Sequence, residues 1–131
     1  SFGNENLIEA LTSVKNSFNS YPVDKIASIA ATSALENDEW YKDKIKQIKT
    51  NRNFLSSELQ NLGFRVLPSS ANFILITHSD YSGLELKNTL MRDKILVRHF
   101  EHQDISNWIR VTIGTLDECT SVLDCLKKKI A

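Results

Sequence analysis

The chain is 131 residues long, which is the size of one ordinary domain and is enough to bury a substantial hydrophobic core. Hydrophobic residues make up 41% of the sequence and charged residues 24%, which is typical of a soluble globular protein. Sixteen basic residues balance sixteen acidic ones, so the charge argues against binding to nucleic acid or to an anionic membrane surface.

The N-terminal stretch SFGNENLIEAL lacks the sections of a signal peptide, and no apolar run approaches the ~20 residues of a membrane span. We therefore predict a cytoplasmic location. The two cysteines, Cys119 and Cys125, fall on different faces of a predicted helix. Their spacing is neither a CxxC redox pair nor a metal site, so we predict buried or half-buried thiols.

The first half of the chain is predicted to be helical. Residues 4–18 carry apolar side chains at helical spacing, with Asn4 or Asn6 as the N-cap. The sequence NSFNSYP at residues 16–22 favours a turn, in which Pro22 suits the start of the next helix.

The second helix is expected to run to about Asn37, and a third helix to run from there to a C′ glycine, Gly63. At 1.5 Å per residue the third helix would be roughly 37 Å long, more than the width of a small domain. It is therefore expected to span two bodies.

After the third helix the apolar period becomes alternating, which indicates strands. Two capping boxes, Ser82 with Glu85 and Thr115 with Glu118, predict the starts of two further helices. The predicted strands are Phe64 to Leu67, Ala71 to Thr77, Ile95 to Phe100 and Asn107 to Thr115. The order of elements predicts an α+β fold: a small, mostly antiparallel sheet of three to four strands with helices packed on one face.

Two arginines interrupt the apolar pattern of these strands. Arg110, in NWIRVTIGT, lies on the face opposite Ile109 and Val111, and Arg98, in ILVRHF, interrupts its own strand in the same way. One interpretation is an arginine on a solvated sheet face, which antiparallel sheets commonly have. The other is an anion clamp of two guanidinium forks, to which Asn72 could add an amide.

Other sequence signatures of chemistry are missing. The sequence has no GxGxxG, GxxxxGK[ST], HExxH or GxSxG motif. His78, His99 and His102 are too scattered to be assigned as metal ligands or bases. By local chemistry alone the chain is not predicted to be a self-sufficient enzyme.

The succession ANFILI, a helix, ILVR, and then IRVTIGT before an acidic helix start resembles the C-terminal part of histidinol-phosphate aminotransferase-like enzymes of fold type I. The pair Asn51 and Arg52 and the stretch VKNSFNSYPVDKIASIAATSALE are also similar to this family, so the resemblance covers nearly the whole chain. It implies a helical segment at residues 1–37 that links from a large domain, and a C-terminal small domain at residues 38–131.

The resemblance also implies roles for individual residues. Arg110 is implied to bind the acidic end of the substrate, and Arg98 to assist with the phosphate in histidinol-phosphate enzymes. Asn72 is implied to lie near the active-site cleft. Arg52 matches a family position as well, where we expect an interhelix or interdomain salt bridge rather than a substrate contact.

Family members use pyridoxal phosphate, and their Schiff-base lysine and other cofactor-binding residues belong to a large N-terminal domain. No lysine of this chain matches the Schiff-base motif. We therefore expect an inactive fragment, with no specific cofactor site, of an enzyme that moves an amino group between histidinol phosphate or a similar amino compound and 2-oxoglutarate. Its expected partners are the anionic substrate, the large domain and, in the full-length protein, a second copy.

A second interpretation stays open: a free-standing, non-catalytic α+β module that binds a small anionic metabolite through the same arginines. The amino donor is open too, because relatives act on histidinol phosphate, aromatic amino acids and phosphothreonine-like compounds. We also expect the second and third helices to leave apolar surface uncovered, which favours self-association.

Overall fold

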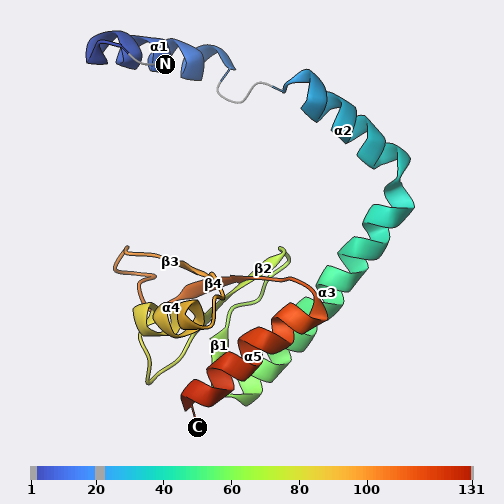
Figure 1. Cartoon of the computed structure of the whole chain (residues 1–131), viewed down its shortest axis with the longest axis vertical. Coiled ribbons are helices and arrows are strands. Elements are labelled where there is room, and N and C mark those ends of the chain that lie inside the picture. The colour runs from blue at the N-terminus through green and yellow to red at the C-terminus, as the bar shows by residue number, and fades with distance from the viewer. Residues whose placement is uncertain (1–2, 20–22, 131) are drawn as a thin grey trace. The chain divides into compact units, whose positions relative to one another are not determined.

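The computed structural model describes residues 3–19 and 23–130 (Figure 1). The chain divides into two compact units, Ser1–Tyr41 and Lys42–Ala131. The boundary between them falls within one long helix, and each unit is described by itself. The predicted domain division after residue 37 stays a prediction.

The first unit contains α1 (Glu5–Asn19), α2 (Lys25–Glu36) and the start of α3 (Asp38–Asn61). Of the two candidate caps for α1, Asn4 is used, since its Oδ1 accepts a hydrogen bond from the Asn6 amide at 3.0 Å. The side chain of Asp24 caps α2, and its Oδ1 accepts from the amide of Ala27 at 2.8 Å.

The predicted turn at residues 16–22 is wrong in its first part, because α1 continues to Asn19. The hydroxyl of Ser17 donates to the carbonyl of Ser13 at 2.9 Å, so this turn-favouring residue is satisfied inside the helix. Residues 20–22, which include the proline predicted to suit the start of the next helix, lie outside the described residues.

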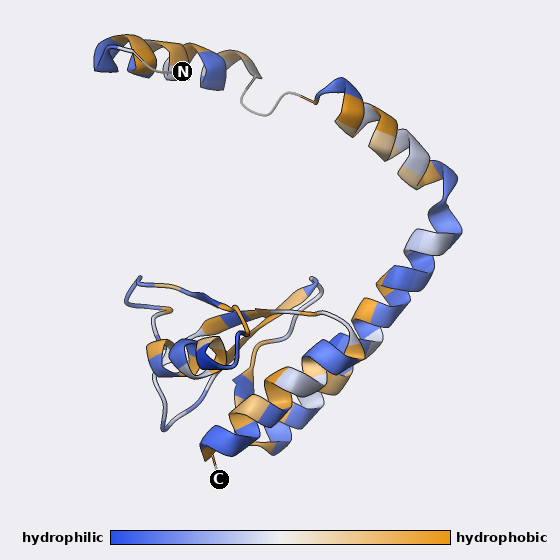
Figure 2. Ribbon diagram, viewed as in Figure 1, coloured by the Kyte–Doolittle hydropathy of each residue, from blue (hydrophilic) through white to orange (hydrophobic). Residues whose placement is uncertain are grey.

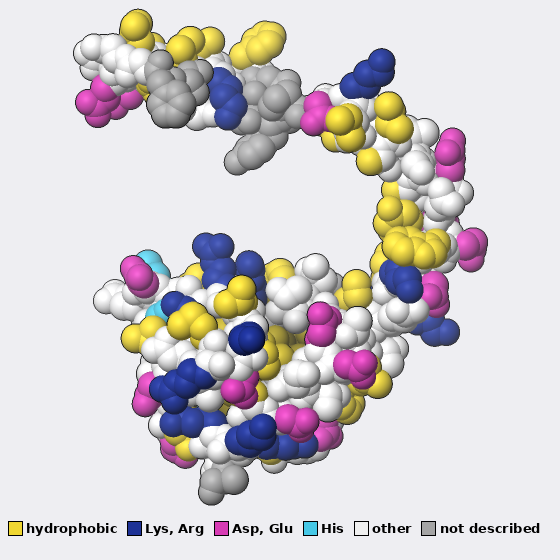
Figure 3. All heavy atoms as spheres, in the orientation of Figure 1, with side chains coloured by type: hydrophobic (Ala, Val, Ile, Leu, Met, Phe, Trp, Pro, Cys, Tyr) yellow, Lys and Arg dark blue, Asp and Glu magenta, His cyan; other side chains and the backbone are white. Residues whose placement is uncertain are grey.

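The apolar side chains of α1 and α2 are exposed within this unit. Leu7 is 64% exposed and Phe18 is 92% exposed, and α2 has no buried residue among those described. Figure 3 shows hydrophobic side chains along both helices. The expected uncovered apolar surface is therefore present on α2, and it extends to α1.

The second unit is built on a four-stranded antiparallel sheet in the order β1-β2-β4-β3. The strands are β1 (Arg65–Val66), β2 (Phe73–Thr77), β3 (Arg98–His99) and β4 (Ile109–Thr112). Helix α4 (Gly83–Arg92) lies between β2 and β3 in the chain, and α5 (Leu116–Ile130) follows β4. The predicted α+β fold is confirmed.

One face of the sheet carries the hydrophobic core. Strand β2 alternates between buried Ile74 and Ile76 and half-buried Phe73 and Leu75, and β4 alternates in the same way. The buried strand residues join those of α3, α4 and α5 in a single cluster, so the helices cover this face only. Figure 2 shows the apolar stripe of α5.

The helix ends in this unit follow the sequence signals. Helix α3 ends at Asn61, and Gly63, two residues later, has a φ of 86°, the left-handed conformation that glycine favours after a helix. Both predicted capping boxes are formed: Glu85 accepts from the amide of Ser82 at 2.8 Å, and Glu118 accepts from the amide of Thr115 at 2.7 Å. These caps set where α4 begins after β2 and where α5 begins after β4.

The predicted strand Ile95 to Phe100 is wrong in extent, because only Arg98 and His99 pair with β4. Lys94 has a left-handed φ of 62°, and the amide of Ile95 donates back to the carbonyl of Leu90 at 2.9 Å. This closure of α4 turns the chain away from the sheet edge. Residues 95–97 instead line a cleft of about 650 Å³ against α5.

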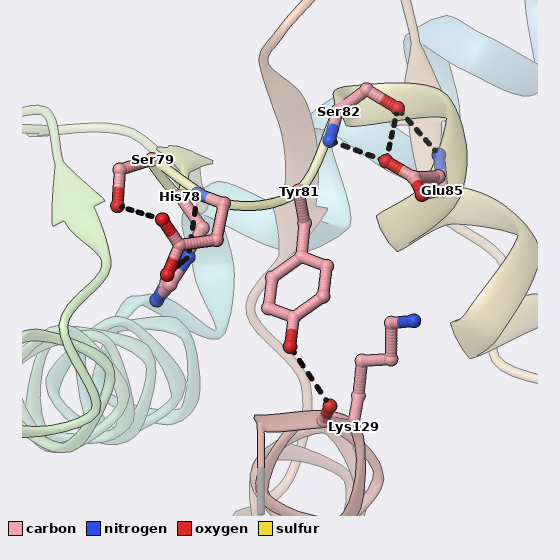
Figure 4. A network of polar contacts seen from close by, with 7 residues as sticks. His78, Ser79, Tyr81, Ser82, Glu85 and Lys129 are labelled. Carbon is pink, nitrogen blue, oxygen red and sulfur yellow. Dashed lines mark hydrogen bonds and ion pairs between the residues drawn. The ribbon is translucent and has the colours of Figure 1, made fainter.

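The loop before α4 contacts the end of α5 through Tyr81 and Lys129 (Figure 4). The hydroxyl of Tyr81 donates to the carbonyl of Lys129 at 3.2 Å, and the Lys129 ammonium lies 4.8 Å from the centre of the Tyr81 ring. The loop, α4 and α5 are thereby held together on the covered side of the sheet.

Both cysteines are buried, as predicted. Cys119 and Cys125 line the cleft beside α5, and the Cys125 thiol lies 3.8 Å from the carbonyl oxygen of Thr89. Within the described ranges, the helices are too short or too polar to cross a bilayer.

Candidate functional site

Arg98 and Arg110 are neighbours on the sheet face that the helices leave uncovered. They are direct register partners across β3 and β4, which places their Cβ atoms about 5 Å apart. Arg110 is also the register partner of Leu75, whose strand neighbours Ile74 and Ile76 point into the core. We call this uncovered side, with Arg65, Phe73, Leu75, Arg98, Trp108 and Arg110, the open face.

Each clamp arginine is supported by an aromatic ring. The guanidinium carbon of Arg110 lies 5.0 Å from the centre of the Phe73 ring, and that of Arg98 lies 5.4 Å from the Phe100 ring. A guanidinium over a ring face is attracted by the ring, while its N–H donors stay available to an anion.

No carboxylate balances these two charges within the described part of the chain. His78 with Asp80 and His102 with Asp104 are ion pairs of the second unit, and neither includes Arg98 or Arg110. Like charges placed directly opposite each other destabilise a sheet. Two adjacent guanidinium groups of this kind can together donate several hydrogen bonds to one anion.

A third arginine, Arg65, belongs to the same face and was not predicted. Arg65 lies on β1 and is the register partner of Thr77 on β2, and its guanidinium carbon lies 5.4 Å from the centre of the Trp108 ring. The sequence signal was present, because Arg65 interrupts the apolar run FRVL as Arg98 interrupts ILVR. The register of β1 was needed to place it.

Asn72 is not placed beside the arginines by the sheet pairing. It lies in a bend before β2, three positions from Leu75, which is the register partner of Arg110. The carbonyl of Asn72 accepts from the amide of Ile113 at 2.8 Å, and its side chain is exposed. In the structure, the backbone hydrogen bond of Asn72 therefore extends the pairing of β2 and β4 by one step.

The expected interhelix or interdomain salt bridge of Arg52 stays a prediction, and the structure describes a backbone contact for this side chain. Its Nη1 donates to the carbonyl of Ala71 at 2.7 Å, and the neighbouring Asn51 donates from Nδ2 to the carbonyl of Gly114 at 2.9 Å. The Ala71 carbonyl lies in the bend before β2, and the Gly114 carbonyl lies two residues after β4 ends. Helix α3 therefore anchors one end of the β2 and β4 pair, and β4 carries Arg110.

Each of the three histidines contacts a nearby residue of the second unit. His99 Nε2 lies 2.7 Å from the carbonyl oxygen of Ser106, and the His78 ring packs edge-on against Phe64. His102 is exposed beside Asp104. Among residues 3–19 and 23–130, no three acidic, histidine or cysteine side chains cluster as a metal site.

Burial sets the chemistry of the thiols in the cleft. Desolvation, followed by the nearby Asp93 carboxyl group, raises the pKa of Cys125 to about 11. Desolvation also raises the pKa of Cys119. Because the thiolate is the nucleophilic form, both cysteines are poor nucleophiles at neutral pH.

Comparisons with known proteins agree on one family. Residues 1–126 match the family described as aminotransferase class I and II. The chain is 44% identical over 129 residues to a histidinol-phosphate aminotransferase of Clostridium botulinum, a match that covers 98% of this chain and 36% of the relative. It is 44% identical over 126 residues to histidinol-phosphate aminotransferase 2 of Dechloromonas aromatica, covering 96% of this chain and 35% of the relative.

A solved structure shows the same fold. The histidinol-phosphate aminotransferase of Clostridium acetobutylicum superposes with a TM-score of 0.74 at 26% identity, over 93% of this chain and 38% of that one. The chain thus spans little more than a third of the length of the proteins it resembles.

Proposed function

The chain belongs to the aminotransferase class I and II family, and from this we propose that it serves as the C-terminal part of a pyridoxal phosphate-dependent aminotransferase. The proposed reaction moves an amino group between histidinol phosphate, or a similar amino compound, and 2-oxoglutarate. The identity of 44% to a histidinol-phosphate aminotransferase supports this choice of amino donor.

The observation that carries the proposal is the pair of adjacent arginines on the open face. Arg98 and Arg110 present two guanidinium groups to one side, each stacked on a ring and neither paired with a described carboxylate. A phosphate or carboxylate bound between them would receive several charge-assisted hydrogen bonds. It would also relieve the repulsion between the two cations.

In this proposal the arginines act by binding and orienting. Holding the anionic end of the substrate fixes the distance and direction of its amino-bearing carbon, which removes much of the entropic cost of reaction. The hydrogen bonds from Arg52 and Asn51 keep the end of the sheet in place, so they support the position of Arg110 without touching the substrate.

The cofactor is assigned to the rest of the enzyme. Pyridoxal phosphate requires a lysine for its aldehyde and a carboxylate for its pyridine nitrogen. The side chains that define the open face are arginine, aromatic and leucine, with neither of those groups among them. These residues fit an anionic substrate and do not fit the cofactor, so no chemical step is assigned to this chain.

The test is kinetic and uses the full-length enzyme that contains this chain. Arg110→Ala is expected to lower kcat/KM for the phosphorylated amino donor by at least about tenfold, which corresponds to about 1.4 kcal/mol. Arg92→Ala is the matched control, because Arg92 is exposed on α4, on the covered side of the sheet. Unchanged kinetics for Arg110→Ala would remove the clamp from the proposal.

A further inference from the structure

The open face extends beyond the two clamp arginines toward the other edge of the sheet. Arg65 on β1 and Trp108 just before β4 flank Thr77 of β2, so they belong to one row across the sheet. Trp108 is two residues before Arg110, which places both on the same face about 7 Å apart along the strand.

The side chain of Arg65 contacts an aromatic ring beside a strand that is not its direct neighbour. Its strand is two places from β4, a distance of about 10 Å between backbones. Its guanidinium carbon nevertheless lies 5.4 Å from the centre of the Trp108 ring. The side chains of Arg65 and Trp108 therefore meet across β2, which lies between β1 and β4.

This second position resembles the clamp in its chemistry. Arg65 is exposed, Trp108 is half-buried, and no described carboxylate forms an ion pair with Arg65. A guanidinium stacked on a ring keeps the N–H donors at its edge free to bind an anion. Three arginines, each stacked on its own aromatic ring, thus share one face of the sheet.

We propose that Arg65, supported by the Trp108 ring, is a second anion-binding position, and that the open face binds small ligands with two separated carboxylates. One carboxylate is held by Arg98 and Arg110 and the other by Arg65. The amino acceptor 2-oxoglutarate is a dicarboxylate of this class. This inference rests on the clamp of the proposed function and adds a residue that decides between ligands with one and two anionic groups.

The two tryptophans of the sequence make the position measurable in the 131-residue chain. One is Trp108, and the other is Trp40 in the first unit, so Trp40→Phe leaves the emission of Trp108 as a local reporter. This variant is titrated with acetate, malonate, succinate and glutarate at constant ionic strength. At least one dicarboxylate is expected to bind about tenfold more tightly than acetate and to change the Trp108 emission.

The decisive variant is Arg65→Gln in the Trp40→Phe background. It is expected to reduce dicarboxylate affinity to the level of acetate while acetate affinity stays the same. Arg92→Gln is the control for net charge, since it removes the same charge on the covered side of the sheet. Trp108→Phe provides a second variant, followed by calorimetry, and is expected to weaken the dicarboxylate preference while keeping a ring under Arg65.

The outcomes separate this inference from the clamp. A dicarboxylate preference that survives Arg65→Gln, or falls equally in Arg92→Gln, overturns the second position. Loss of all anion binding in Arg110→Gln supports the clamp, whereas unchanged acetate binding in Arg110→Gln removes the clamp and leaves the effect of Arg65 to be judged by its own variant. A wild-type chain that binds none of the four anions overturns both.

Discussion

The two faces of the sheet are made by the same strands and have opposite chemistry. On the covered face, Ile74, Ile76, Ile109 and Val111 are at most 2% exposed and pack against three helices. On the open face, the alternating positions hold arginines and half-buried rings, and the core helices of the second unit lie on the other side. Successive residues of a strand therefore alternate between the hydrophobic core and the open face, where the proposed anion-binding residues lie.

This division explains why charges can accumulate on so small a domain. The core is complete on one side, so the other side can hold cations that are unfavourable to the fold. Arg98 and Arg110 stand directly opposite each other, an arrangement that a sheet selected for stability alone would avoid.

The largest expected effect separates two neighbours on β2. Ile76→Ala is expected to lower the free energy of unfolding by about 2–5 kcal/mol, because Ile76 is fully buried and its loss leaves a cavity. Leu75→Ala, on the half-buried open face, is expected to cost less than half as much. Urea unfolding of both variants gives the comparison, and equal losses would contradict the division into faces.

A smaller effect concerns the thiols on the covered side and appears only at alkaline pH. The folded state raises the pKa of Cys125 to about 11, so it holds the thiol proton more tightly than the unfolded chain, with a pKa of about 8.5, does. The contribution to stability is complete below the unfolded pKa and is lost as pH rises toward 11.

Cys125→Ala is the comparison for this pH dependence. The urea midpoint is expected to fall more between pH 8 and pH 10.5 in the wild type than in the variant. The smaller fall that the variant still shows comes from other groups that titrate in this range, such as lysines. Parallel pH profiles for the two proteins would show that Cys125 is not the group responsible.

The smallest expected effect has the opposite sign. Arg98→Gln removes one of two facing cations on the open face, so the free energy of unfolding is expected to stay within about 0.5 kcal/mol or to rise slightly. Thermal unfolding at low ionic strength, where repulsion is least screened, is the sensitive measurement. A loss above about 1 kcal/mol would show that Arg98 also has a role in the fold.

The sequence was sufficient for features that depend on local pattern. Alternation in NWIRVTIGT identified the face of Arg110, and the capping boxes at Ser82 and Thr115 marked two helix starts correctly. Both kinds of signal act over a few residues, so no tertiary contact is needed to interpret them.

Features that depend on contacts between distant parts of the chain could not be predicted from the sequence. The strand around Arg98 is short because Lys94 adopts a left-handed conformation, which no propensity of lysine indicates. The bond from Arg52 to the Ala71 carbonyl joins a helix to a distant bend. Arg65 becomes part of the site only once β1 is paired with β2 in its observed register.

The strand order β1-β2-β4-β3 also governs when this domain can form during synthesis. The inner edge of β2 has no partner until β4 emerges from the ribosome, because β4 is last in sequence and lies between β2 and β3. A nascent chain that has not reached Ile109 lacks the central strand, and the contact of Asn51 with Gly114 must wait longer still. The central strand pairing of the sheet therefore forms only after the segment around Ile109 has been synthesised, which makes this a late, non-local step of folding.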